Sequence, residues 1–285
     1  MLKDMFRKTA PWAMVVMVLI GWCVAAAGSE LRLLDLATGK ILSGDRATAR
    51  LSAAQFVLVG EFHDDAEHHR AELEVIRSLH RTGRSVAVGL EMFRRNSQAD
   101  LDRWVDGSID ETRFKSIYLD NWNFKWTLYR PIFDYARRNK IPMIGLNVPP
   151  SVTAQVAFHG FDSLSARQKG DLRGITCNVT SEYRDFIQQA YGAHAHGEMD
   201  FDNFCEAQLV WDTAMAVNSI AYAERHPETV LVILAGSGHA RKMGIPTQIA
   251  KRSSRPFLVL LPLTPGVFDA ENVTVQDADY LIVND

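Results

Sequence analysis

The sequence predicts an α/β fold with a mostly parallel, doubly wound sheet and a smaller helical subdomain. Two observations predict it. Short apolar, β-branched runs recur along the chain and are continuous, which is typical of strands covered on both faces of a parallel sheet. The stretches between these runs have the length and apolar spacing of amphipathic helices, and strands that alternate with helices build parallel βαβ units.

The expected elements can be placed along the chain. The expected strands are residues 56–59, 86–88, 143–146, 230–234 and 257–261. Helices are expected at 64–81, 128–139 and 204–225, where apolar residues recur at helical spacing. From about residue 151 to 224 no convincing strand pattern is present, so this stretch is predicted to be a helical insertion packed on the sheet.

The composition is that of an ordinary globular protein. With 285 residues, of which 47% are hydrophobic and 23% charged, the chain can bury a sizeable core. The formal net charge is −3, and no run of basic residues with interleaved aromatics is present. Nucleic acid is therefore not an expected partner.

Residues 1–27 are predicted to be a secretory signal peptide. Basic residues precede the apolar run 12–24, and the alanines that follow supply the small side chains that a signal peptidase needs. Two alternatives remain: the apolar run is retained as a membrane anchor, or Cys23 accepts a lipid. Trp22 argues against the lipid, because the residue before a lipidated cysteine is normally small. The mature chain, 28–285, is expected in the periplasm or cell envelope.

Export affects how the remaining cysteines are interpreted. Only Cys177 and Cys205 lie beyond the predicted signal peptide. In an oxidising compartment they either form a disulfide or remain two separate buried thiols.

Polar residues follow four of the predicted strands at the point where each strand ends. Glu61 and His63 follow the first strand, Glu91 the second, Asn147 the third and His239 the fourth. The carboxyl ends of parallel strands meet along one edge of the sheet, and ligands bind in the crevice outside that edge. These side chains, distant in sequence, are therefore predicted to converge on one site.

His63 and His239 share a Gly-x-x-His spacing directly after a strand, which favours metal binding or proton transfer over a purely structural role. Glu91 is expected in the site because an acid after an apolar strand is costly to bury without a partner. Glu61 either belongs to the site or orients a histidine. Arg94 either clamps an anionic group or is a solvated helix residue.

The start of the helix expected at 64–81 carries two acids and two histidines. Asp64 and Asp65 are expected to cap this helix. His69 lies in line with the apolar face and is expected to pack inward, whereas His68 is expected to turn toward the site; the alternative for either histidine is a surface position.

Taken together, these motifs resemble the ChaN-like family, which is implicated in haem and iron uptake in bacterial envelopes and belongs to a superfamily with the Tiki metalloproteases and the erythromycin esterases. The resemblance covers roughly residues 47–260. The motifs that carry it are Gly60-Glu61-Phe62-His63-Asp64 with His68-His69, Gly89-Leu90-Glu91-Met92-Phe93, Tyr129-Arg130-Pro131-Ile132, Gly145-Leu146-Asn147-Val148-Pro149, residues 207–216, and Gly236-Ser237-Gly238-His239 with Gly244-Ile245-Pro246.

The resemblance implies a haem-binding protein of the cell envelope, with haem held between the protomers of a homodimer and components of envelope transport as partners. The iron would be held by a tyrosine or histidine side chain. The candidates for haem binding include Tyr129, His194 and His196.

The alternative is a metal-dependent hydrolase of the Tiki or esterase type. In it, His63, Glu91 and His239 hold a divalent ion that keeps an open position for water, and Glu61 joins them as a catalytic residue. Around these ligands the residues expected to orient them are Asp64, His68, Arg94 and Asn147.

Overall fold

The structure is a computed structural model that describes residues 30–172, 175, 177–191 and 200–283. Its strands form one eight-stranded sheet in the order β2-β1-β8-β7-β3-β6-β4-β5. The strands are β1 (Arg32–Asp35), β2 (Ile41–Ser43), β3 (Phe56–Glu61), β4 (Val86–Arg94), β5 (Met143–Asn147), β6 (Val230–Gly236), β7 (Phe257–Pro262) and β8 (Tyr280–Ile282).

The sheet is mostly parallel, which confirms the predicted fold class. The neighbours β8, β7, β3, β6, β4 and β5 all pair in parallel, and β1 joins β8 antiparallel and forms an antiparallel hairpin with β2. The five strands expected from the sequence form the contiguous block from β7 to β5. The three unexpected strands are short, and β1 and β2 are partly exposed, so they carry no long apolar run.

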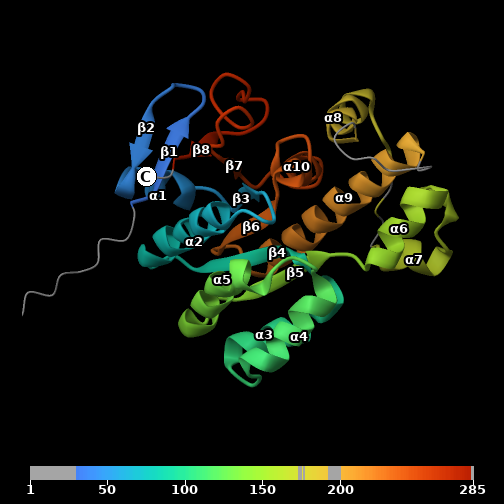
Figure 1. Cartoon of the computed structure of the whole chain (residues 1–285), viewed down its shortest axis with the longest axis horizontal. Helices are drawn as coiled ribbons and strands as arrows, with labels where there is room; N and C mark the ends of the chain where they lie inside the picture. Colours follow the sequence, from blue (N-terminus) through green and yellow to red (C-terminus); the bar gives the residue numbers. More distant parts are fainter. Residues whose placement is uncertain (1–29, 173–174, 176, 192–199, 284–285) are drawn as a thin grey trace, which may run out of the picture.

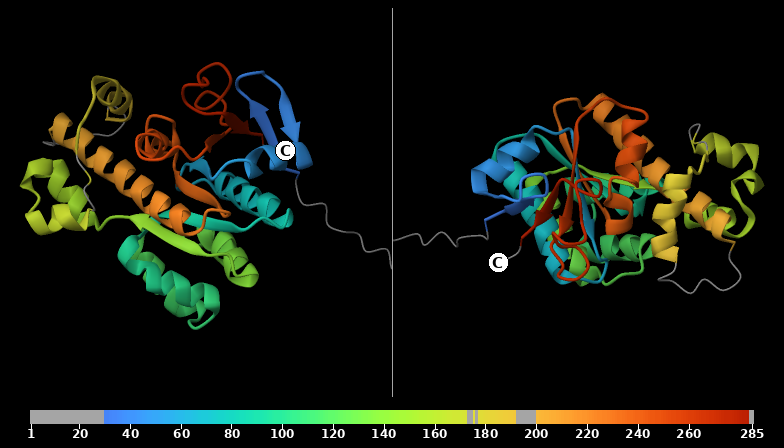
Figure 2. Two further views of the ribbon diagram at one scale, coloured as in Figure 1. Left: turned by 180° about the vertical axis from the view of Figure 1, so that it is seen from behind. Right: turned by 90° about the horizontal axis from the view of Figure 1, so that it is seen from above.

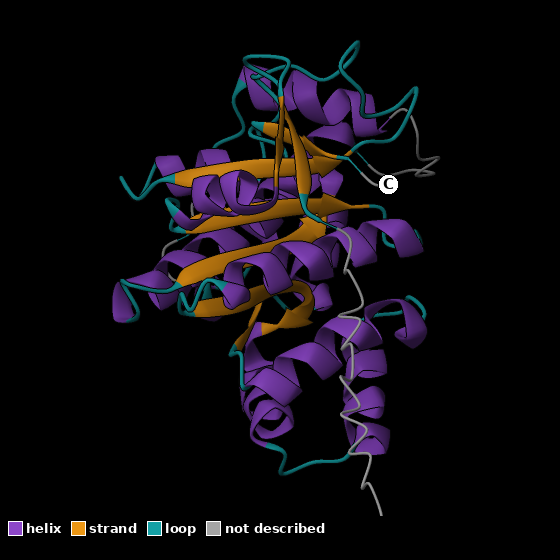
Figure 3. Cartoon of the chain, turned by 90° about the vertical axis from the view of Figure 1, so that its left-hand side faces the viewer, coloured by secondary structure: helices purple, strands orange, loops and turns teal. Residues whose placement is uncertain are grey.

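Helices cover both faces of this sheet (Figure 3). One face packs against α1, α2, α3, α4 and α5, and the other against α9, α10 and α11. The helices are α1 (Gly44–Ser52), α2 (Ala66–Arg81), α3 (Gln98–Asp106), α4 (Glu111–Asn121), α5 (Trp126–Asn139), α6 (Pro150–His159), α7 (Ala166–Asp171), α8 (Ser181–Tyr191), α9 (Phe201–Arg225), α10 (Ser237–Ala240) and α11 (Ile245–Ala250).

A smaller helical part lies at one end of the molecule, where α6, α7 and α8 gather around the first half of α9 (Figures 1 and 2). Two small apolar clusters join α6 and α7 to α9, and α8 to α9. No strand is found among the described residues between β5 and β6. The second half of α9 packs on the sheet, so this one helix connects the helical part to the strand ends.

The start of α2 shows how local sequence positions the site. Asp65 is the N-cap residue, and its side chain accepts hydrogen bonds from the backbone N–H groups of Glu67 and His68. This satisfies two of the donors that a helix start leaves open. The capping role expected for Asp65 is confirmed. The cap sets where the first turn of α2 begins, and that turn carries the two histidines.

Several predictions fall partly outside the described residues. The predicted signal peptide, 1–27, lies outside them. Among the described helices, none combines the length and the apolar character needed to span a bilayer.

Cys177 and Cys205 are both free thiols in the same apolar cluster beside α8, so the structure has the unpaired form of the two alternatives.

Candidate functional site

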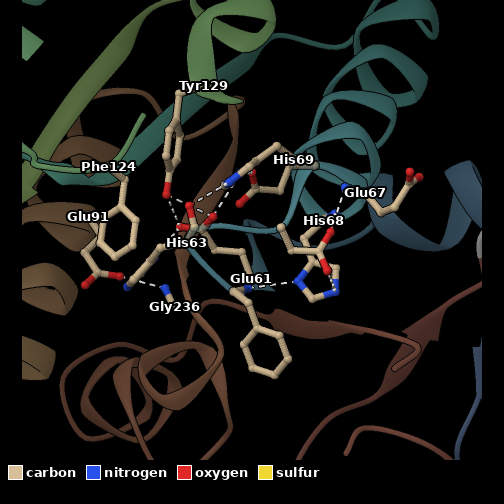
Figure 4. A network of polar contacts seen from close by, with 12 residues as sticks. Glu61, His63, Glu67, His68, His69, Glu91, Phe124, Tyr129 and Gly236 are labelled. Carbon is tan, nitrogen blue, oxygen red and sulfur yellow. Dashed lines mark hydrogen bonds and ion pairs between the residues drawn. The ribbon is translucent and has the colours of Figure 1, made fainter. Parts of the chain in front are cut away.

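Two predicted site residues, His63 and Glu91, lie beside Gly236 at the carboxyl edge of the sheet (Figure 4), and a third, His239, approaches Glu91. The backbone N–H of Gly236 donates to Glu91 Oε2 at 2.7 Å. A Cβ added at Gly236 would lie 3.1 Å from His63 Nε2 and 3.7 Å from Glu91 Oε2. His239 Nε2 approaches Glu91 Oε1 at 3.8 Å. The parallel-strand argument therefore brings together side chains from three separate segments, and glycine is required where they meet.

Each of the two histidines is oriented by a buried acid through its Nδ1 atom. His63 Nδ1 donates to Glu61 Oε1 at 2.8 Å, and His239 Nδ1 donates to Asp212 Oδ1 at 2.7 Å. The Nε2 atoms are thereby left on the side of Glu91. A carboxylate on one ring nitrogen fixes the tautomer and the orientation of the imidazole, as it does for histidines in metal and proton-transfer sites.

Asp212 was not predicted as a site residue. It lies on α9, is 1% exposed, and its second oxygen, Oδ2, accepts from the hydroxyl of Tyr183 on α8 at 2.6 Å. The available signal was an acid within the apolar stretch of α9, because a buried acid requires partners. The helical part of the chain therefore contacts the site through Tyr183 and Asp212.

A second buried network lies behind Glu61. The Tyr129 hydroxyl donates to Glu61 Oε1 at 2.8 Å. His69 Nδ1 lies 2.9 Å from Glu61 Oε2 and 2.9 Å from Glu72 Oε2, while its Nε2 lies 3.2 Å from the carbonyl oxygen of His63. An ionised Glu61 and the carbonyl oxygen of His63 can only accept hydrogen bonds, and they face the two ring nitrogens of His69. Each nitrogen therefore needs a proton, so this network favours the imidazolium form of His69.

The pKa values of the two acids in this network, Glu61 and Glu72, are shifted in opposite directions. Burial opposes ionisation of Glu61, but hydrogen bonds from His63 and His69 outweigh it and lower the pKa of Glu61 to about 2. Burial lowers the pKa of His69, but hydrogen bonds to Glu61 and Glu72 raise it to about 10. Burial and the charge of Glu61 raise the pKa of Glu72 to about 8. Glu61 is therefore the ionised acid and Glu72 the protonated one at neutral pH.

The two site histidines are also shifted. Burial lowers the pKa of His239, but the charges of Glu91 and Asp212 and the hydrogen bond to Asp212 raise it to about 9. Burial likewise acts against the charged form of His63, and the hydrogen bond to Glu61 with the charge of Glu91 raises its pKa above the ordinary value. The Asp212 carboxyl has a raised pKa, chiefly because it is buried. Groups with shifted pKa values that lie close together are typical of functional sites.

The grouping of possible metal ligands differs from the prediction. Among the described residues, the side chains whose ligand atoms all lie within 4.8 Å of one another are Glu61, His69 and Glu72. His63, Glu91 and His239 share the edge of the sheet but do not form such a group. In the group that does form, the spaces between the atoms are already bridged by hydrogen bonds.

Comparisons with known proteins place this arrangement in a family. The family model described as haem-binding uptake, Tiki superfamily, ChaN, matches residues 47–249. The chain belongs to the ChaN family. The match includes the strand-end residues, the α2 histidines and the helical part, and confirms the resemblance found in the sequence.

Solved and curated relatives of this ChaN-family chain are distant in sequence. The structure of ChaN of Campylobacter jejuni with cofacially bound haem has a TM-score of 0.70 at 22% identity, covering 90% of this chain and 97% of that one, and shows the same fold. An erythromycin esterase mutant, EreC, in its open conformation, has a TM-score of 0.49 at 14% identity, covering 83% and 77%. The protein RETICULATA-RELATED 5, chloroplastic, of Arabidopsis thaliana is 24% identical over 250 residues; these are 77% of this chain, which spans about a third (32%) of that relative.

The roles expected for the two α2 histidines are partly exchanged. His69 packs inward as predicted, yet it is the one that enters the site network. His68, expected to turn toward the site, accepts instead from the backbone N–H of Phe62 at 2.9 Å, and its Nε2 lies 3.3 Å from Thr264 Oγ1. His68 therefore holds the β3–α2 loop in place from the far side. Asp64, in the same loop, is close enough to His68 to act on its pKa, which burial lowers.

Asn147 and Arg94 also differ in their contacts. Asn147 Nδ2 donates to the backbone carbonyl of Glu91 at 2.9 Å, so it holds the strand segment that carries this acid. Arg94 turns away: its Nε donates to Asn121 Oδ1 on α4 at 2.9 Å. Asn147 is thus bonded to the segment that carries Glu91, and Arg94 is bonded to α4.

The haem candidates are not brought together by the structure. Tyr129 is fully buried, at 0% exposure, and its hydroxyl donates to Glu61. His194 and His196 lie outside the described residues.

Proposed function

We propose that this chain binds haem in the cell envelope and serves the uptake of haem or iron. The observation that carries the proposal is the family match, which spans the sheet and the helical part rather than a single motif. Haem needs a side chain to hold its iron and apolar surroundings for its macrocycle. A chain of this family is expected to provide both.

The test is a titration of the mature chain, 28–285, with haemin. A saturable Soret band is expected, together with a shift of the hydrodynamic mass from monomer toward homodimer. A double variant with His63→Ala and His239→Ala should leave most of the haemin binding intact, because these residues belong to the strand-end site around Gly236, which this proposal does not assign to haem. Absence of a saturable signal from the unaltered chain would contradict the proposal.

Export is a separate part of the proposal. The basic start, the apolar run and the alanines that follow it support removal of residues 1–27. Protein purified from envelope fractions should therefore begin near Gly28. Soluble cytoplasmic protein with an intact Met1 would argue against export. If the chain is exported, transport components can be sought by co-purification with it from envelope extracts.

The alternative function, a metal-dependent hydrolase, is argued from one arrangement of side chains. Two imidazoles, each oriented by a buried acid, turn their Nε2 atoms toward the carboxylate of Glu91. This arrangement suits a hydrolase in which His63, Glu91 and His239 hold a divalent ion, and the bound ion would activate a water molecule. In that function Glu61 and Asp212 orient the histidines.

The two functions are separated by their dependence on His63. The metal content of the purified chain, measured by mass spectrometry, and the turnover of ester and peptide substrates should both be lost in His63→Ala if the second function holds. His80→Ala is the matched control, because His80 bonds to Tyr135 away from the site. Stoichiometric zinc or manganese that disappears in His63→Ala, without any haemin signal, would replace the first proposal with the second.

A further inference from the structure

A cavity of about 320 Å³ lies beyond the carboxyl end of β5, where the helical part of the chain meets the sheet. Its wall is built by residues that follow β4 and β5, by α6, by α7 and the residues after it, and by the middle of α9. Among the described residues of this wall, none belongs to the group around Gly236. Ligands of parallel sheets bind outside the carboxyl edge, and a cavity of this size is characteristic of small-molecule sites.

Most of the cavity wall is apolar. Val148, Val152, Leu172 and Ala214 line it, are at most 9% exposed, and belong to the apolar cluster that joins α6 and α7 to α9. Val217 on α9 extends the same surface. These side chains come from several packed elements, so they enclose a chamber and not a flat patch. Such a chamber favours an apolar ligand body, because moving apolar surface out of water is favourable.

Arg95 provides the positive charge of this wall. Its Nη1 donates to Asn218 Oδ1 at 2.8 Å, and Asn218 Nδ2 donates in turn to the carbonyl of Leu146 at 2.7 Å. The guanidinium is thereby tethered to β5 through a buried amide on α9. A charged group that the protein already holds in place loses little conformational freedom when it binds an anion.

The amide side chains of the wall differ in their availability. Asn147 donates to the Glu91 carbonyl, and Gln168 completes the capping box at the start of α7, so both serve the protein itself. Asn96, directly after Arg95, is exposed, and its side chain makes no hydrogen bond within the described part of the chain. Two consecutive residues therefore present N–H donors to the cavity.

This wall suits a ligand with one negative charge and an apolar body. Among its described residues, Arg95 is the one cation, and there is no acid. A guanidinium binds a carboxylate through two parallel hydrogen bonds. A phosphate monoester carries nearly two negative charges at neutral pH, and the second charge would be left without a cation in this wall.

We propose that this cavity binds an apolar monocarboxylate of the medium-chain fatty acid type. The carboxylate lies on Arg95 and Asn96, and the chain lies among Val148, Val152 and Leu172. At about 320 Å³ the cavity is near the small end of the range of about 300–1,000 Å³ for ligand sites, which favours a medium chain over a long one. The assignment depends neither on haem binding nor on hydrolysis at the strand-end residues.

The test uses octanoate as the probe, titrated into the mature chain, 28–285, by calorimetry. Octanoate should bind saturably. Octanol keeps the chain without the charge and should bind about tenfold more weakly. Acetate keeps the carboxylate without the chain and should bind about a hundredfold more weakly. Octyl phosphate should also bind more weakly than octanoate, and tighter binding of octyl phosphate or octanol would overturn the choice of a carboxylate.

Three variants locate the binding. Arg95→Gln should lower the affinity for octanoate about tenfold and leave that for octanol unchanged. Val152→Phe fills the chamber and should weaken the binding of both probes. Arg138→Gln is the matched control, because Arg138 is exposed on α5, which packs on the opposite face of the sheet from α9, and both affinities should stay the same.

The outcomes keep the assignment testable even if Val152→Phe folds poorly, since Arg95 is exposed and its replacement leaves the core intact. An unaltered chain without saturable octanoate binding would overturn the proposal, as would an Arg95→Gln variant with full affinity for octanoate. The double variant His63→Ala with His239→Ala should bind octanoate as the unaltered chain does. Loss of binding there would place the ligand at the strand-end residues and overturn the choice of this cavity.

Discussion

Replacing Glu72 by glutamine should change how the stability of this protein depends on pH. Glu72 is fully buried, one of its oxygens accepts from His69, and the other, Oε1, has no hydrogen-bond partner among the described residues. Its pKa is raised from an ordinary 4.5 to about 8, because burial and the charge of Glu61 disfavour a second negative charge. At neutral pH the side chain is therefore an uncharged acid, and glutamine is a close match in shape and charge.

The sign of the effect follows from proton binding. Between pH 4.5 and about 8 the folded chain holds a proton on Glu72 that the unfolded chain has lost. The free energy of unfolding therefore falls as the pH rises through this window, by roughly 1.4 kcal/mol per pH unit. Across the whole window the loss is about 5 kcal/mol. The Glu72→Gln variant carries no titrating proton there, so its own contribution is flat.

The assay is urea unfolding followed by circular dichroism, repeated at intervals between pH 5 and 8. The difference in unfolding free energy, variant minus unaltered chain, should rise steadily with pH and level off near the pKa of Glu72, about 8. Glu67→Gln, an exposed residue on the same helix, is the control and should give a curve parallel to that of the unaltered chain. Parallel curves for Glu72→Gln as well would refute the reasoning, because they would mean that Glu72 is ionised in the folded protein.

Two further substitutions test the geometry around Gly236. Gly236→Ala places a Cβ 2.9 Å from His63 Cε1, so it should lower the unfolding free energy by about 1–3 kcal/mol; Gly238→Ala meets nothing within 4 Å and should cost far less, and equal losses would contradict the close approach. Asp212→Asn removes a charge that raises the pKa of His239, so nuclear magnetic resonance titration should show that pKa falling from about 9 toward its ordinary 6.5, and an unchanged value would rule out the pairing.

The sheet could be predicted from the sequence because its central strands are buried on both faces. Burial on both faces requires continuous apolar runs, and the strands from β7 to β5 have them. The convergence of His63, Glu91 and His239 followed from a rule of topology: parallel strands share one carboxyl edge. The short strands β1, β2 and β8 at the other end carry too few residues to produce such a pattern.

The hydrogen-bond partners of these side chains could not be predicted from the sequence. Asp212 and Tyr183 lie on α9 and α8, and their side chains form a chain of hydrogen bonds to His239. No pattern in the sequence around either residue predicts this pairing. The neighbouring histidines of α2 point in directions about 100° apart, and periodicity could place His69 inward without showing that Glu61 and Glu72 were there to meet it.

The sequence by itself therefore determined the fold class, the family and the edge of the sheet where polar groups meet, because these depend on local patterning and on the direction of strands. Only the tertiary structure decided which acid pairs with which histidine, and that Tyr129 is buried against Glu61. Hydrogen-bond partners are chosen by distances of about 3 Å between segments far apart in the chain. Such distances exist only once the helices have packed on the sheet.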